Sequence, residues 1–180
     1  MKRPGFARRM SSAALCILSV AVLPAAAQDG PGPSFARSSV YLEILGPGVF
    51  YSVNYDYRFT QRFGVRAGFS TWTIEPIFSF DGDELSFAGF PLTANYLTGD
   101  GPSHVEFGAG IVPVFISSDG TNHFFGDEYH ESGTVLLGTL SMGYRMQPPD
   151  GGFMLRVVMT PLFSAEDFAW TAGLSFGYAW

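Results

Sequence analysis

Large apolar and small side chains alternate strictly over residues 170–180, and this pattern limits the possible folds more than any other feature of the sequence. One face of an extended chain would carry Trp170, Ala172, Leu174, Phe176, Tyr178 and Trp180. The opposite face would carry Thr171, Gly173, Ser175, Gly177 and Ala179. Successive side chains of a β-strand point to opposite faces, so a period of two predicts a strand. An apolar face opposite a small one is typical of a lipid-facing strand in a closed barrel.

Seven further segments alternate in the same way and complete a set of eight. They are residues 39–45, 49–59, 62–74, 87–98, 104–116, 132–147 and 153–163. Most approach or exceed the about 9–11 residues that a tilted strand needs to cross a bilayer. Their connections are short Gly, Pro and Asp turns or long polar loops at 75–86 and 117–131. We therefore predict an all-β fold, an eight-stranded antiparallel up-and-down transmembrane β-barrel with its short turns in the periplasm.

A soluble β-sandwich or lipocalin-like barrel would also alternate, but it would turn its polar face to water. In residues 62–70 the apolar set is Phe63, Val65, Ala67 and Phe69. The opposite set is Gly64, Arg66, Gly68 and Ser70. A water-facing set would usually carry Lys and Glu, and after residue 27 the chain has no lysine. The composition of the faces therefore favours the membrane barrel.

The first 27 residues are predicted to be a cleaved secretory signal peptide. Four basic residues precede an apolar stretch from Ser11 to Leu23, and Ala25, Ala26 and Ala27 supply the small residues that signal peptidase requires. About 13 apolar residues are too few for a membrane-spanning helix, which needs about 20. We expect a short periplasmic tail at 28–38, a barrel at 39–180, and a location in the bacterial outer membrane.

The charge that remains after residue 27 is strongly acidic. This part keeps six arginines, no lysine and all sixteen acidic residues, so its formal net charge is −10. Nucleic-acid binding requires a basic surface to meet the phosphates, so a nucleic-acid partner is excluded. No residue pattern requires a cofactor.

Continuing the alternation turns seven charged side chains toward the barrel interior. They are Glu43, Asp56, Arg58, Arg66, Glu106, Arg145 and Arg156. An isolated charge in a low-dielectric interior is costly, so we expect the three acids and four arginines to form one paired network. The interior of an eight-stranded barrel is just wide enough for side chains to fill it. The network would therefore close the lumen, and the alternative is a narrow gated path for ions or small solutes.

Several stretches resemble a family of small outer-membrane β-barrel proteins, the porin-like barrels of the OmpX and OmpW kind. They are Ser39–Glu43 followed by Gly46-Pro-Gly48 and Tyr51–Tyr55, then Phe63–Gly68, Pro91–Tyr96, Met142–Arg145 and Gly173–Trp180. The last is similar to the family's C-terminal assembly signal, which implies that role for Leu174, Phe176, Tyr178 and Trp180. The resemblance also implies insertion by the barrel-assembly machinery with the help of periplasmic chaperones. It implies no catalytic residue.

The polar loop at 117–131 contains the densest cluster of potential metal ligands and nucleophiles. His123, Asp127 and His130 are a weak candidate metal site, because imidazole and carboxylate together suit Zn²⁺ or Cu²⁺. An enzyme acting on outer-membrane lipids from the barrel rim would need Ser117 or Ser118 with one of the histidines. No spacing in the loop indicates a catalytic triad, so we expect a solvated acidic loop without catalysis.

These observations predict a monomer that contacts outer-membrane lipids and lipopolysaccharide and has a structural or surface-interaction role. The loops at 75–86, 117–131 and 164–168 contain ten acids and no basic residue. Such loops would repel lipopolysaccharide phosphates, so we expect Ca²⁺ or Mg²⁺ to bridge the two. The alternatives are a narrow pore or carrier for small solutes, and an enzyme at the rim.

Overall fold

The computed structural model describes residues 35–74, 84–99, 101–122, 127–165 and 167–180, except for the side chains of residues 74, 84, 119–122 and 127–131. The predicted signal peptide at 1–27 and most of the predicted tail at 28–38 lie outside these residues. Among the described residues, no helix has the length and hydropathy of a membrane-spanning helix.

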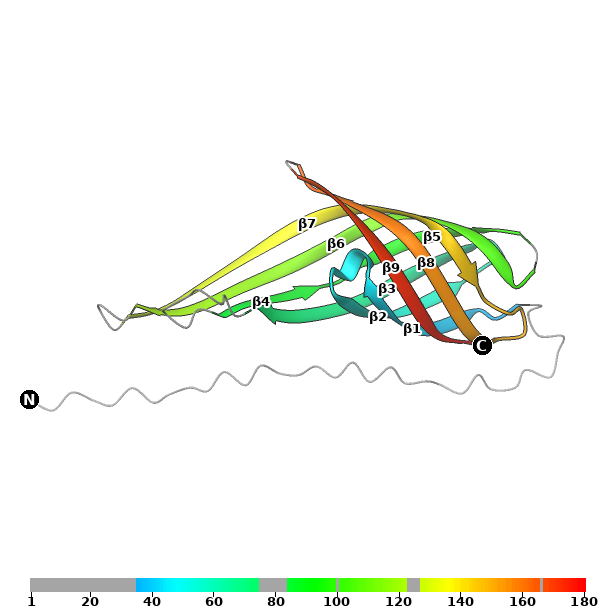
Figure 1. Ribbon diagram of the computed structural model, residues 1–180, viewed down its shortest axis with the longest axis horizontal. Helices are drawn as coiled ribbons and strands as arrows, with labels where there is room; N and C mark the ends of the chain where they lie inside the picture. Colours follow the sequence, from blue (N-terminus) through cyan, green and yellow to red (C-terminus); the bar gives the residue numbers. More distant parts are fainter. Residues whose placement is uncertain (1–34, 75–83, 100, 123–126, 166) are drawn as a thin grey trace, which may run out of the picture. The chain divides into compact units, whose positions relative to one another are not determined.

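The described chain consists of β-strands and one short 3-10 helix, η1 (Figure 1). The elements are β1 (Ser38–Leu45), η1 (Gly46–Gly48), β2 (Tyr51–Arg58), β3 (Phe63–Ile74), β4 (Glu84–Gly89), β5 (Leu92–Thr98), β6 (Ser103–Asn122), β7 (Asp127–Met146), β8 (Gly152–Phe163) and β9 (Phe168–Ala179). Strands β4 and β5 lie in line between β3 and β6 and act as one strand. The interruption falls at Phe90 and Pro91, because proline has no N–H for the ladder.

The strands close into an antiparallel barrel, as predicted. Each strand pairs with its neighbours in sequence, and β1 pairs with both β2 and β9. Counting β4 and β5 together, the ring has eight strands in up-and-down order. Closure gives every strand two partners, so the barrel has no open edge. The short connections at 59–62, 99–102 and 147–151 share one end of the barrel with the C-terminus, here named the turn end; the opposite end is the loop end (Figure 1).

Alternation along the strands separates an apolar outside from a polar inside. In β2 every odd-numbered side chain is exposed and every even-numbered one is buried, so Tyr55 and Tyr57 face outward while Asn54 and Asp56 face inward. In β9, Leu174, Phe176 and Tyr178 are exposed, and Ser175 and Ala179 on the opposite face are buried. The strand faces therefore have the orientation expected from the sequence.

The interior has two layers. A polar layer lies toward the turn end and contains all seven predicted charged residues. Toward the loop end, the buried side chains of Val112, Val114 and Leu162 form an apolar cluster. Phe87, Ile116 and Leu137 are partly buried against this cluster.

The prediction of a long loop at 117–131 is wrong for most of these residues. Strands β6 and β7 stay paired from Ser117 and Ser132 out to Asn122 and Asp127. The ladder continues because backbone groups pair whatever the polarity of the side chains. The other predicted loop, 75–86, is shortened in the same way, since Glu84 to Ser86 pair with β6.

Gly177 lets β1 and β9 approach closely enough to close the barrel. A Cβ atom at Gly177 would overlap with the carbonyl oxygen of Val40 and would lie 2.6 Å from the Cα of Tyr41. Both obstacles are backbone atoms, so no side-chain rotation can relieve the overlap. We expect Gly177→Ala to lower the free energy of unfolding by about 1–3 kcal/mol, measured by urea unfolding of the refolded barrel.

The matched control is Gly133→Ala in β7, where a Cβ atom would meet no atom within 4 Å. It should unfold at the wild-type urea concentration. Equal stability of the two variants would contradict the close approach of β1 and β9.

Candidate functional site

Six charged side chains inside the barrel form a single chain of ion pairs with alternating sign. Each is at most 2% exposed, and each comes from a different strand. In order along the chain they are Arg66, Glu43, Arg156, Glu106, Arg145 and Asp56, and we name this set the charge network. With three positive and three negative groups it is formally neutral.

The ion pairs at the centre of the network are short and directional. Arg156 uses Nη1 to reach Glu43 Oε1 at 2.5 Å and Nε to reach Glu106 Oε1 at 2.9 Å. The second oxygen of Glu106 is 3.3 Å from Arg145 Nη1. Glu106 is therefore shared by two guanidinium groups, and Arg156 is shared by two carboxylates.

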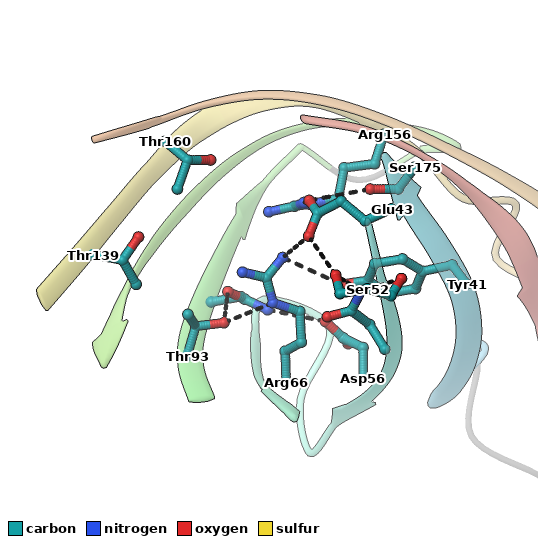
Figure 2. Close-up of polar contacts among 12 residues, drawn as sticks. Tyr41, Glu43, Ser52, Asp56, Arg66, Thr93, Thr139, Arg156, Thr160 and Ser175 are labelled. Carbon is teal, nitrogen blue, oxygen red and sulfur yellow. Dashed lines mark hydrogen bonds and ion pairs between the residues drawn. The ribbon is translucent and has the colours of Figure 1, made fainter. Parts of the chain in front are cut away.

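The chain of ion pairs ends in Arg66 on one side and in Asp56 on the other. Arg145 Nη1 is also 3.1 Å from Asp56 Oδ2, and Arg66 Nη1 is 3.6 Å from Glu43 Oε2. Figure 2 shows Glu43 between the guanidinium groups of Arg156 and Arg66. Burial of each charge is costly, and in this arrangement every charge has an opposite partner.

Neutral side chains from neighbouring strands complete the polar layer. Thr93 accepts a hydrogen bond from Arg66 Nε at 3.0 Å, and Asn95 donates to Asp56 at 2.9 Å. Ser39 accepts from Arg145 Nη2 at 3.1 Å. Ser52 and Ser175 both donate to Glu43 (Figure 2).

The sequence interpretation did not single out these neutral partners, nor the buried Tyr41 beside Arg66. The alternation places them on the inner face, so that signal was present. The alternation does not show which of the inward-facing residues lie at the same height in the barrel.

The 3-10 helix η1 covers the network on its loop-end side. Gly46, Pro47 and Gly48 are buried, and a Cβ atom at Gly46 would lie 2.9 Å from the Glu43 carboxyl carbon. Gly46 has φ +74°, which glycine adopts without strain. The flanking Leu45 and Val49 also have positive φ, at 62° and 70°, a conformation that is costly for such side chains. The packing of η1 inside the barrel must therefore offset this strain.

Among the described residues, Arg58 forms no ion pair with a member of the network. It is 3% exposed and lies at the turn end, where Nη2 donates to the Gln61 carbonyl oxygen at 3.1 Å. Its guanidinium carbon lies 5.0 Å from the centre of the Phe35 ring. The structure thus brings together six of the seven predicted residues and places the seventh apart.

The candidate metal site cannot be assembled from the described side chains. His123 lies outside the described residues, and so do the side chains of Asp127 and His130. Where side chains are described, no three His, Cys, Asp or Glu residues are arranged to hold a metal ion. Ser117 and Ser118, the candidate nucleophiles, lie on β6 and pair with Ser132 and Glu131 of β7.

Glu106 lies between two fully buried arginines, so loss of its charge removes an ion pair from both of them. We expect the isosteric Glu106→Gln to lower the free energy of unfolding by about 3–5 kcal/mol, because it leaves buried positive charge uncompensated. Urea unfolding in lipid vesicles measures the change.

Asp150→Asn is the control, since it removes an acid that is exposed on the turn between β7 and β8. A Glu106→Gln protein within about 0.5 kcal/mol of wild type would mean that pairing at Glu106 contributes nothing to stability.

Comparison with known proteins identifies the fold. No protein-family model and no curated protein matches the sequence. Among solved structures, the N-terminal β-barrel domain of Pseudomonas aeruginosa OprF matches with a TM-score of 0.54 and 14% identity, over 83% of this chain and 100% of that one. The attachment invasion locus protein Ail of Yersinia pestis matches with a TM-score of 0.48 and 16% identity, over 81% of this chain and 97% of that one. The chain therefore has the fold of the small eight-stranded outer-membrane β-barrels.

Proposed function

We propose that this chain is an integral protein of the bacterial outer membrane, with a closed lumen and a structural or surface-interaction role. The observation that carries the proposal is the apolar outer face of the barrel. Large apolar side chains are exposed on every strand of the barrel wall except the short β4, among them Leu136 and Met142 at 60% and Trp170 at 65%. A soluble monomer rarely exposes apolar patches beyond a few hundred Å².

Exposed aromatic side chains form two girdles around this face. The girdle at the turn end includes Tyr57, Phe63, Tyr144, Phe153 and Tyr178. The girdle at the loop end includes Phe69, Phe90, Phe115, Phe163 and Phe168. Within the second girdle, the Phe90 ring lies 5.2 Å from that of Phe69 and 5.8 Å from that of Phe115.

On β8 and β9, the separation of the girdles fits the thickness of a membrane. Phe153 and Phe163 are ten residues apart on β8, and Phe168 and Tyr178 are ten residues apart on β9. Ten residues extend about 33 Å along a strand, which is roughly 25 Å along the axis of a barrel whose strands tilt by about 40°. The apolar band of outer-membrane barrels is about 25 Å tall, so the spacing supports a lipid-facing surface.

In the outer membrane, the chain would contact the partners expected from the sequence. The apolar band would contact outer-membrane lipids, and the loop end would face lipopolysaccharide on the cell surface. Delivery by periplasmic chaperones and insertion by the barrel-assembly machinery belong to the same proposal, with Leu174, Phe176, Tyr178 and Trp180 on the outer face of β9 available for recognition. The cleaved signal peptide and the monomeric state are part of the proposal as well.

A filled lumen supports the structural role over a pore. The charge network and η1 occupy the interior from one wall to the other, and the Val112, Val114 and Leu162 cluster adds a second layer. We also propose that the chain has no catalytic activity, because the six charged side chains of the network are engaged in ion pairs with one another.

The membrane location is tested by fractionation and by one lipid-facing substitution. Wild-type protein should sediment with the outer membrane and migrate faster on gels when unheated. Leu140, which is 50% exposed and six residues before the end of β7, would lie near the middle of the bilayer. We expect Leu140→Arg to lower the free energy of unfolding in lipid by about 2–4 kcal/mol.

Ala165→Arg is the control, since Ala165 is exposed on the turn between β8 and β9. It should leave the stability in lipid within about 1 kcal/mol of wild type. A wild-type protein that is soluble without detergent, or a Leu140→Arg protein as stable as wild type, would refute the membrane location.

A closed lumen predicts the absence of stable conductance steps when the purified barrel is inserted into planar lipid bilayers. The charge network leaves no continuous path for hydrated ions, so the expected trace stays at the baseline. Reproducible steps on the order of nanosiemens would instead favour the narrow pore or carrier.

A further inference from the structure

A small cavity at the turn end has the features of a binding site that the proposed function does not use. Its volume is about 180 Å³. It is lined by Phe35, Arg58, Gln61, His104, Gln147 and Pro149, together with two glycines of the turn after β5. The cavity therefore lies beside the charge network but on its periplasmic side in the proposed orientation.

Arg58 gives this cavity a buried positive charge. Arg66, Arg145 and Arg156 each have a carboxylate partner, whereas among the described residues no carboxylate reaches Arg58 within 4.0 Å. Asp56, two residues earlier on the same face of β2, is already held by Arg145 and Asn95. The Arg58 Nε is buried without a hydrogen-bond partner, as is one guanidinium nitrogen of each arginine in the network, so the missing carboxylate is what sets Arg58 apart. An unpaired buried cation is costly, so an anion in the cavity would be stabilised there.

Gln147 adds an acceptor on another wall of the cavity. Its side chain is 1% exposed, and its Nε2 donates to the Ala36 carbonyl oxygen at 3.3 Å. The Oε1 atom of the same amide is buried and has no partner. His104 is also buried and is oriented by a 3.0 Å hydrogen bond from Nδ1 to the Thr98 carbonyl oxygen. The cavity is thus lined by one guanidinium and one amide that each have a buried atom without a partner.

We propose that this cavity binds a small carboxylate that carries an N–H or O–H donor next to the acid group. The carboxylate would accept hydrogen bonds from Arg58, whose planar donor fork matches carboxylate geometry. The amino or hydroxyl group would donate to Gln147 Oε1. The volume of about 180 Å³ is sufficient for a small organic acid of this kind. Alanine and lactate have this size and chemistry.

The test titrates full-length folded barrel in detergent with L-alanine, L-lactate and propionate, using saturation-transfer NMR to measure binding. We expect alanine and lactate to bind with a Kd of about 1 mM or tighter. Propionate lacks the donor and should bind about 10-fold more weakly, because Gln147 Oε1 then stays unpaired. No binding of any of the three below about 50 mM would overturn the proposal.

Three variants separate this site from nonspecific binding. Arg58→Gln should weaken alanine binding at least 10-fold. Gln147→Leu should weaken alanine but leave propionate unchanged. The control Arg62→Gln removes the same charge from an exposed side chain at the same end of the barrel and should bind like wild type. Unheated gel mobility verifies that each variant is folded, and equal affinity of Arg58→Gln and wild type would refute the site.

Asp100 requires a parallel measurement, because it lies between the two lining glycines and outside the described residues. The variant Asp100→Asn removes this carboxylate, so binding measured in it reports on the added ligand alone. Asp100→Asn should therefore bind alanine at least as tightly as wild type, and Arg58→Gln should abolish that binding too. Binding that survives Arg58→Gln in this background contradicts the proposal.

Discussion

Closure of the sheet between β1 and β9 is the constraint on which the rest of the structure depends. In lipid no water is present to satisfy backbone N–H and C=O groups, so a sheet can cross a membrane only if every strand has two neighbours. The pairing of β1 with both β2 and β9 meets this condition. Once the ring is closed, each strand has one face outward and one toward the lumen, and the period of two in the sequence determines which residues lie on each.

The charge network follows from that division and also reinforces it. Its six members come from six strands, so the network forms only when those strands have the correct register. A slip of one residue would turn Glu43 or Arg156 to the apolar outer face, away from its partners in the network. Buried ion pairs are weak evidence for net stability. Here their clearest physical effect is to exclude wrong registers.

Alternation made the fold and the inward side chains predictable, but it carried no information on distances. The sequence placed Arg58 and Arg66 on inner faces equally well, yet only Arg66 reaches Glu43, because Arg58 lies at the turn end. The inward turn of η1 depends on the positive φ of Leu45 and Val49, which no propensity favours. The prediction of a loop at 117–131 was wrong because polar side chains do not prevent two strands from pairing. The backbone groups of β6 and β7 form their ladder whether the side chains are polar or apolar.

The extended β6–β7 hairpin gives the barrel two functionally different ends. Phe115 belongs to the loop-end girdle, and from Ser117 onward the paired strands carry polar residues. The six residues from Ser117 to Asn122 extend about 20 Å beyond that point along the strand. A hydrogen-bonded ladder loses less conformational entropy on binding than a free loop does, so it is a better platform for surface contacts. The turn end carries instead the small cavity beside Arg58, whose volume of about 180 Å³ limits any recognition there to small molecules.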